Sequence, residues 1–138
     1  MDKDFGFIRL PKGIEMRKPY ASELKYFKKN ANVAGMATED NRVILNPYSN
    51  LNPDQYQSVA VNEASRIMMR QPEFKPDFEL TNQQKSFLDT TTYRNATEDE
   101  RRATIAARIL SGDSSAGVAT SEQNMFVDRL KSAFQANQ

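Results

Sequence analysis

Residues 52–70 read NPDQYQSVAVNEASRIMMR, and this stretch predicts the central helix of the fold. Asn52 is a favoured N-cap residue, and Pro53 suits the first helical position because no N–H is needed there. Apolar residues then recur at steps of three and four along the stretch: Tyr56, Ala60, Ala64, Ile67 and Met68. Since such steps place side chains on one face of a helix, we expect this face to form part of the core.

The segment before this helix has the pattern of a β-hairpin. Two apolar runs, residues 33–37 and 42–45, flank Glu39-Asp40-Asn41, which has the chemistry of a turn. Residues 46–49 (Asn-Pro-Tyr-Ser) then predict a structured turn into the helix. A two-stranded hairpin alone is marginal in water, so it must pack on the helices or extend the sheet of a partner.

Signals for helix starts predict the remaining helices. Ser22 is a favoured N-cap for a short helix that carries Leu24 and Phe27 on its apolar side. After the central helix, Pro72 and Pro76 predict an extended stretch. Capping boxes, in which a Thr and a later Glu or Gln each bind the other's backbone N–H, then open further helices. These boxes are Thr81 with Gln84, Thr97 with Glu100, and Thr120 with Gln123.

Together these signals predict an α+β fold that is mainly α, with about five short helices, one β-hairpin and an extended N-terminal arm. The arm comprises residues 1–19, where prolines and glycines interrupt a stretch without helical periodicity. Residues 20–138 are expected to form a single mainly helical domain, since 138 residues fit one domain. Four apolar side chains of the arm need a surface, either on this domain or on a neighbour: Phe5, Phe7, Ile8 and Leu10.

The chain contains no histidine and no cysteine. This excludes the Ser-His-Asp triad, Cys-His nucleophiles, zinc sites of the usual His or Cys type, and disulfides. Catalysis would have to rest on carboxylates, Lys, Tyr or Ser alone. We therefore expect a protein that is not an enzyme and that needs no cofactor or metal.

One motif in the central helix has a chemical precedent. Residues 62–66 (Asn-Glu-Ala-Ser-Arg) have the spacing of the H-E-x-x-H helix of zinc peptidases, with Asn62 and Arg66 in place of the histidines. A cationic Arg does not ligate zinc, so one interpretation is a catalytically dead relative of a zinc-peptidase-like fold. The favoured interpretation is a structural polar network, in which Glu63 pairs with Arg66 or another Arg, and Asn62 hydrogen-bonds a loop.

The distribution of charge bears on the class of partner. The formal net charge is only +1, so nucleic acid is not indicated as a partner. Residues 1–32 nevertheless carry eight Lys and Arg against four Asp and Glu. Three lysines of this region either contact an acidic partner or form a solvated face: Lys25, Lys28 and Lys29. No apolar run reaches the length of a membrane span, and the N-terminus lacks the apolar region of a secretory signal.

Three segments carry a family resemblance: residues 32–49, residues 61–66 and residues 106–113. They resemble a family of small, mostly uncharacterised proteins of tailed bacteriophages, notably short-tailed ones. The likeness extends over roughly residues 20–130 and leaves the arm outside it. The resemblance implies a phage product and carries over no functional residues.

A phage product of this composition is expected to work by protein–protein binding. The favoured role is a virion-associated structural protein, either capsid-associated, at the head–tail junction or internal, assembled in the host cytoplasm. It would bind other virion proteins, and also copies of itself, because assemblies tie subunits together with arms and added strands. The alternative is an accessory protein that binds and inhibits a host enzyme during infection. The residues expected to contact a partner are Phe5, Phe7, Ile8, Leu10, Lys25, Lys28 and Lys29.

Overall fold

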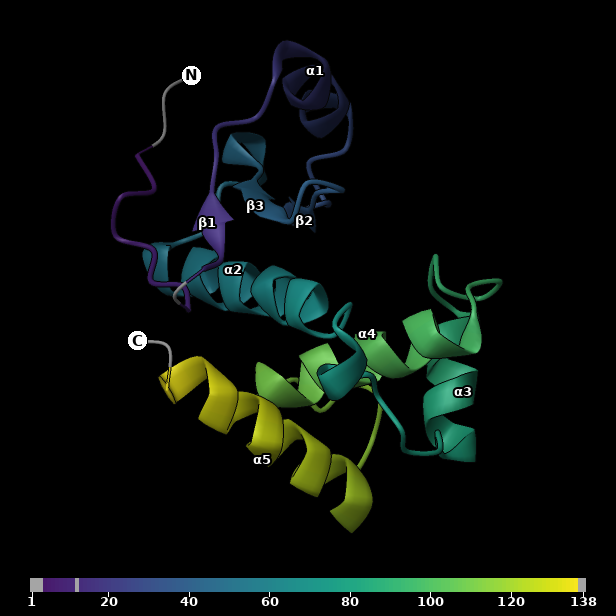
Figure 1. The fold of residues 1–138 in the computed structure, drawn as a ribbon. Helices are drawn as coiled ribbons and strands as arrows, with labels where there is room; N and C mark the ends of the chain where they lie inside the picture. Colours follow the sequence, from purple (N-terminus) through teal and green to yellow (C-terminus); the bar gives the residue numbers. More distant parts are fainter. Residues whose placement is uncertain (1–3, 12, 137–138) are drawn as a thin grey trace. The chain divides into compact units, whose positions relative to one another are not determined.

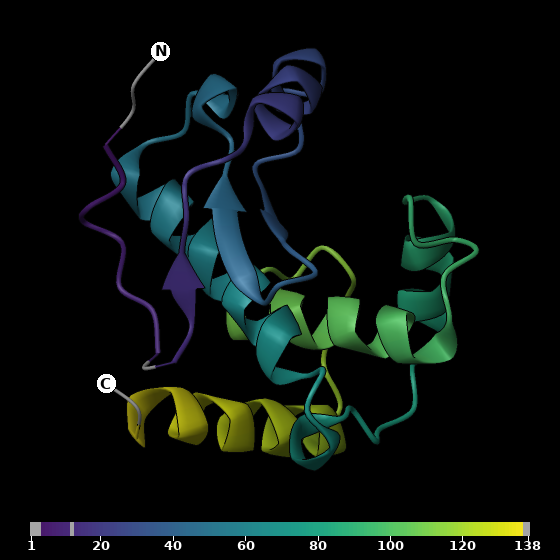
Figure 2. The ribbon, with the colours of Figure 1, turned by 45° about the horizontal axis from the view of Figure 1, so that its top comes forward.

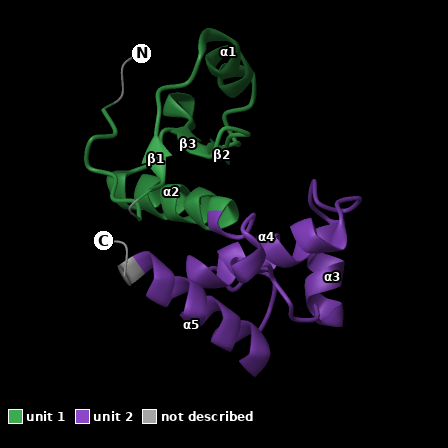
Figure 3. Ribbon diagram, viewed as in Figure 1, with its two compact units in different colours: residues 1–67, 137–138 green, residues 68–136 purple. Residues whose placement is uncertain are grey.

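A computed structural model describes residues 4–11 and 13–136 of the chain. The described residues form five α-helices and a small three-stranded sheet, which confirms the predicted mainly α class (Figure 1). The chain divides into two compact units (Figure 3): unit 1 comprises residues 1–67 with 137–138, and unit 2 comprises residues 68–136. The residues of the arm that the structure describes belong to the same unit as the hairpin.

The sheet of unit 1 has the strand order β1-β3-β2. β2 (Gly35–Ala37) and β3 (Arg42–Leu45) form the predicted antiparallel hairpin, whose turn contains Asn41 with a φ of 61°. β1 (Glu15–Met16) pairs in parallel with β3, and this strand within the arm was not predicted. Two residues are too few to show the alternating pattern by which a strand is recognised in a sequence.

Unit 1 contains the helix α1 (Ala21–Lys29), the 3-10 turn η1 (Pro47–Ser49) and most of the predicted central helix α2 (Pro53–Met68). The N-cap of α1 is Tyr20, so the expectation for Ser22 was wrong. Glu23 explains the earlier start, because its carboxylate accepts the backbone N–H of Tyr20 at 2.8 Å. At the start of α2, Asn52 and Gln55 each accept the other's backbone N–H.

The sheet lies against α2 (Figure 2). Three successive residues of β3 are completely buried: Val43, Ile44 and Leu45. Gly35 of β2 lies close to the side chain of Val59 on α2. A Cβ atom at this position would lie 2.9 Å from Cγ1 of Val59 and 3.0 Å from the carbonyl oxygen of Ile44. Glycine is therefore required here by the space between β2 and α2.

Asn46, which is completely buried, joins the separate parts of unit 1. Its side-chain amide donates at 2.7–3.2 Å to the carbonyl oxygens of Phe27, Asn30 and Val33. Its side-chain oxygen accepts the N–H of Tyr48, and its backbone carbonyl accepts the hydroxyl of Tyr56. The side chain of Asn46 thus fixes the end of α1 and the start of η1, and its backbone carbonyl binds helix α2 through Tyr56.

Unit 2 contains the 3-10 turn η2 (Pro72–Phe74) and the helices α3 (Asn82–Asp89), α4 (Glu98–Leu110) and α5 (Ser121–Ala136). The stretch expected to be extended therefore contains a helical turn, because Pro72 at the first position fixes a helical φ. The capping boxes at Thr81 and Thr120 are present as predicted. At Thr97 the hydroxyl oxygen accepts the N–H of Glu100 at 3.2 Å.

The glutamine side chains of the two complete capping boxes contact each other inside unit 2. The side-chain amides of Gln84 and Gln123 bind each other reciprocally at 2.7 and 2.8 Å, and both are buried. Arg101 of α4 fixes the other end of α3, because its guanidinium donates to Asp89 and to the carbonyl oxygens of Tyr93 and Arg94. No helix in the described part of the chain combines the length and apolar character needed to cross a membrane.

Candidate functional site

Unit 1 contains an open cavity of about 550 Å³ between the arm, the segment that leads into α1, and the end of β3. Its walls are mainly apolar and come from Phe5, Met16, Pro19, Leu24, Leu45 and Pro47. Its polar lining comes from Asp4, Arg17 and Lys18. This volume lies within the range of about 300–1,000 Å³ typical of ligand sites, and apolar walls with a few charged groups are typical of them too.

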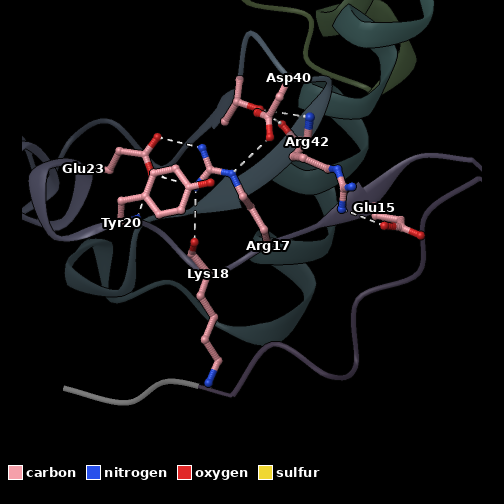
Figure 4. Close-up of polar contacts among 8 residues, drawn as sticks. Glu15, Arg17, Lys18, Tyr20, Glu23, Asp40 and Arg42 are labelled. Carbon is pink, nitrogen blue, oxygen red and sulfur yellow. Dashed lines mark hydrogen bonds and ion pairs between the residues drawn. The ribbon is translucent and has the colours of Figure 1, made fainter.

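A cluster of charged side chains borders this cavity (Figure 4). Arg17 donates two hydrogen bonds to the carboxylate of Glu23, at 2.7 and 3.0 Å, and its Nε lies 3.6 Å from a carboxylate oxygen of Asp40. Its guanidinium also stacks on the ring of Tyr20, 3.9 Å from the ring centroid. Arg17 therefore connects β1 to the first turn of α1 and to the turn of the hairpin.

The electrostatics of the cluster follow from these contacts. The hydrogen bond from Arg17 holds the pKa of Glu23 below its usual value. The hydrogen bond from the Thr38 hydroxyl lowers the pKa of Asp40. The bond to Glu23 also raises the pKa of Arg17. Because each shift favours the charged form, the cluster is a set of fixed ion pairs at neutral pH, unsuited to proton transfer.

The arm lies on α2 of the same unit. The ring of Phe5 contacts the ring of Tyr56 edge-on, with 4.8 Å between centroids. The backbone N–H and carbonyl of Arg9 are both bound by the side-chain amide of Gln57, at 2.9 and 3.0 Å. Of the four apolar residues predicted to contact a partner, Phe5, Ile8 and Leu10 are half-buried, whereas Phe7 is 41% exposed.

The three lysines predicted to contact a partner are all exposed on α1: Lys25, Lys28 and Lys29. Leu24, on the same helix, lines the cavity. The lysine that lines the cavity is Lys18, which lies before α1. Of the residues predicted to contact a partner, Phe5 lines this cavity.

In the motif of residues 62–66 in α2, Glu63 and Arg66 form the predicted ion pair. Nε of Arg66 lies 3.9 Å from a carboxylate oxygen of Glu63, and the two side chains are 19% and 16% exposed. The backbone carbonyl of Asn62 accepts the hydroxyl of Ser65 at 2.6 Å. Elsewhere in the described residues, no group of three or more acidic side chains is placed to hold a metal ion.

Several residues of this site were missed in the sequence: Met16, Arg17, Lys18, Pro19, Leu45 and Pro47. Glu23 sits three positions after the N-cap, as in a capping box, but Tyr20 lacks the short side-chain oxygen by which such a box is recognised. Leu45 and Pro47 were expected in the hairpin and its following turn, where they are, and only the fold shows that they face a cavity. A signal was available in Pro19, which precedes a helix start and is preceded by two cations.

Comparison with known proteins adds no relative to this picture. No model of a protein family matches the chain, and no curated protein or solved structure matches it significantly. The resemblance to phage proteins therefore stays a prediction from three sequence segments.

Proposed function

We propose that this chain is a structural protein of a bacteriophage particle, associated with the capsid, the head–tail junction or the interior, and that it acts by binding other proteins through unit 1. The observation that carries the proposal is the open cavity of about 550 Å³, which has mainly apolar walls. An open apolar cavity on a protein surface is typical of sites that receive the side chains of a partner.

Two further features support this role. Phe7 presents a large aromatic side chain, 41% exposed, on the arm that borders the cavity, and such residues anchor many protein interfaces. The three segments that resemble phage proteins supply the context of the particle. Arms that lie on their own subunit can also contact a neighbouring one, as in other assemblies tied by extended segments.

Mass spectrometry of purified particles tests the proposal. We expect the chain at a constant ratio to the major particle proteins, and a Phe7→Ser variant at a clearly lower ratio. Met125→Ser is the matched control, since Met125 is 71% exposed in unit 2. Absence from particles, with presence in infected cells soon after infection, would refute the structural role and favour the binding of a host enzyme.

A further inference from the structure

The helix α1 presents a basic face to solvent. Lys25, Lys28 and Lys29 are exposed, and their spacing of three and four residues places them side by side on the helix surface. Tyr26, three residues before Lys29, is 47% exposed and extends the same face. We call these four side chains the lysine face of α1. None of them lines the cavity, so the face is a separate surface of unit 1.

Acidic residues nearby in the chain do not balance the charge of this face. Residues 17–29 hold five Lys or Arg and a single acidic residue, Glu23, whereas the whole chain has a formal net charge of only +1. Both carboxylate oxygens of Glu23 accept hydrogen bonds from Arg17, at 2.7 and 3.0 Å. None of the three lysines of the face forms an ion pair with a carboxylate that the structure describes. Their amino groups are therefore open to an external anion.

The composition of the lysine face favours a nucleic acid over a protein as the source of that anion. Lysine is depleted at protein interfaces, whose centres are built on apolar anchors, and the face contains no aliphatic residue. Lysine amino groups are, by contrast, common contacts of phosphate groups, and an exposed aromatic ring beside them offers a stacking surface for a base. The small net charge of the whole chain does not oppose this, because phosphate binding depends on how cations are distributed.

We propose that the lysine face of α1 binds single-stranded nucleic acid without sequence preference, with phosphates on the lysines and a base stacked on Tyr26. The ring selects a single strand, because the bases of a duplex already stack on each other and present no free face. Binding through a few phosphate contacts is weak and depends steeply on salt. The inference goes beyond the proposed role in protein binding and does not rest on it.

Fluorescence anisotropy of a labelled oligothymidylate, titrated with the full chain at increasing salt, tests the inference. We expect a dissociation constant on the order of 10⁻⁵ M at low salt. The logarithm of the association constant should fall against the logarithm of the salt concentration with a slope of about −2, as three phosphate contacts on a single strand give. A duplex of matching length should bind more weakly, because it offers no base to Tyr26.

Variants separate the lysine face from the charge of the chain as a whole. Lys25→Gln/Lys28→Gln/Lys29→Gln should lower the affinity about tenfold or more and bring the salt slope close to zero. The matched control removes three exposed lysines of unit 2 and should bind as the unchanged chain does: Lys75→Gln/Lys85→Gln/Lys131→Gln. Circular dichroism verifies that each variant is folded.

Tyr26 is tested by two substitutions that differ only in the presence of a ring. Tyr26→Phe should retain the affinity, whereas Tyr26→Leu should lower it about fivefold, because only the former can stack on a base.

Several results would overturn the inference: no binding at low salt, equal losses in the two triple-lysine variants, equal affinity for the duplex, or equal affinity of Tyr26→Leu and Tyr26→Phe. Binding of polyglutamate as tight as that of the oligothymidylate would instead identify an acidic protein as the partner. Because particle proteomics is independent of these titrations, the two proposals fail separately. A chain found in particles that binds no oligonucleotide retains its role in the particle, and one absent from particles that binds it retains the site on α1.

Discussion

Both units contain buried side-chain amides, but the hydrogen-bond partners of these amides differ between the units. In unit 1 the side chain of Asn46 binds backbone groups in two segments, the carbonyls of Phe27, Asn30 and Val33 and the N–H of Tyr48. In unit 2 Gln84 and Gln123 serve each other, and each also caps its own helix through the N–H of Thr81 or Thr120. Unit 1 thus depends on one residue that joins distant loops, whereas unit 2 depends on two local boxes joined as a pair.

This difference determines how each unit should respond to mutation. Removing the Asn46 side chain takes one hydrogen bond from each of three carbonyl groups, and the acceptor from the N–H of Tyr48, in a single change. Removing one glutamine leaves the other buried without its partner amide, so most of the loss arises with the first change. Unit 1 should therefore be sensitive at one position, and unit 2 should show strong coupling between two.

The largest effect is expected for Asn46→Ala. The free energy of unfolding should fall by about 3 kcal/mol, because one change removes the amide's hydrogen bonds to the carbonyl oxygens of Phe27, Asn30 and Val33 and empties a completely buried position. Urea unfolding followed by circular dichroism measures this loss. Asn32→Ala, at an exposed position of the same unit, is the control. A similar stability of the two variants would show that Asn46 does not hold unit 1 together.

The next effect is expected for the glutamine pair. Gln123→Ala and Gln84→Ala should each lower the free energy of unfolding by about 2 kcal/mol, with Gln123→Ala the larger because its amide also donates to the carbonyl of Glu79. The double variant should lose less than the sum, with a coupling of about 1–2 kcal/mol. The same urea titrations measure all three, with Asn124→Ala as the exposed control on α5. If the loss in the double variant equalled the sum of the two single losses, the two glutamines would not stabilise the fold as a pair.

The contrast also explains what the sequence could predict. The boxes of unit 2 are local, so Thr81 with Gln84 and Thr120 with Gln123 were recognised from their spacing alone. The hydrogen bond between Gln84 and Gln123 was not predicted, because a contact between residues 39 apart leaves no periodic signal in the sequence. In unit 1 the hairpin and α2 were predicted from the same kind of local pattern.

The candidate site was predicted only in part, for the same reason. Phe5 was singled out as part of an apolar arm, but nothing in the sequence placed it at one cavity with Leu24 and Leu45. β1 was missed because it is only two residues long, and with it the position of Arg17, which follows β1 directly. The site is made where an arm, a short strand and a helix start converge, and each of these is defined by tertiary contacts.

A smaller effect is expected where the polar contact is an ion pair on one helix. Glu63→Ala should lower the melting temperature, since it leaves the guanidinium of Arg66, only 19% exposed, without this carboxylate. The melting temperature of Glu63→Gln should lie between those of Glu63→Ala and the unchanged chain, because the amide retains a hydrogen-bond acceptor but loses the charge. Thermal unfolding by circular dichroism compares them with Glu39→Ala, an exposed position of the hairpin turn. An unchanged melting temperature for Glu63→Ala would refute the structural role of the motif.

The smallest effect concerns the charged cluster beside the cavity, and it should depend on pH. The hydrogen bond from Arg17 makes the pKa of Glu23 lower in the folded chain than in the unfolded chain. The pair's contribution to stability is therefore complete above the usual glutamate pKa of about 4.3 and is lost as pH falls through the lowered folded value. The stability difference between the unchanged chain and Glu23→Gln should accordingly shrink when urea titrations are repeated from about pH 7 to about pH 3. Asp40 also has a lowered pKa and faces Arg17, so the comparison is made again in an Asp40→Asn background. A difference that stays constant with pH there would mean that the shape of Glu23, and not its charge, joins α1 to the strand.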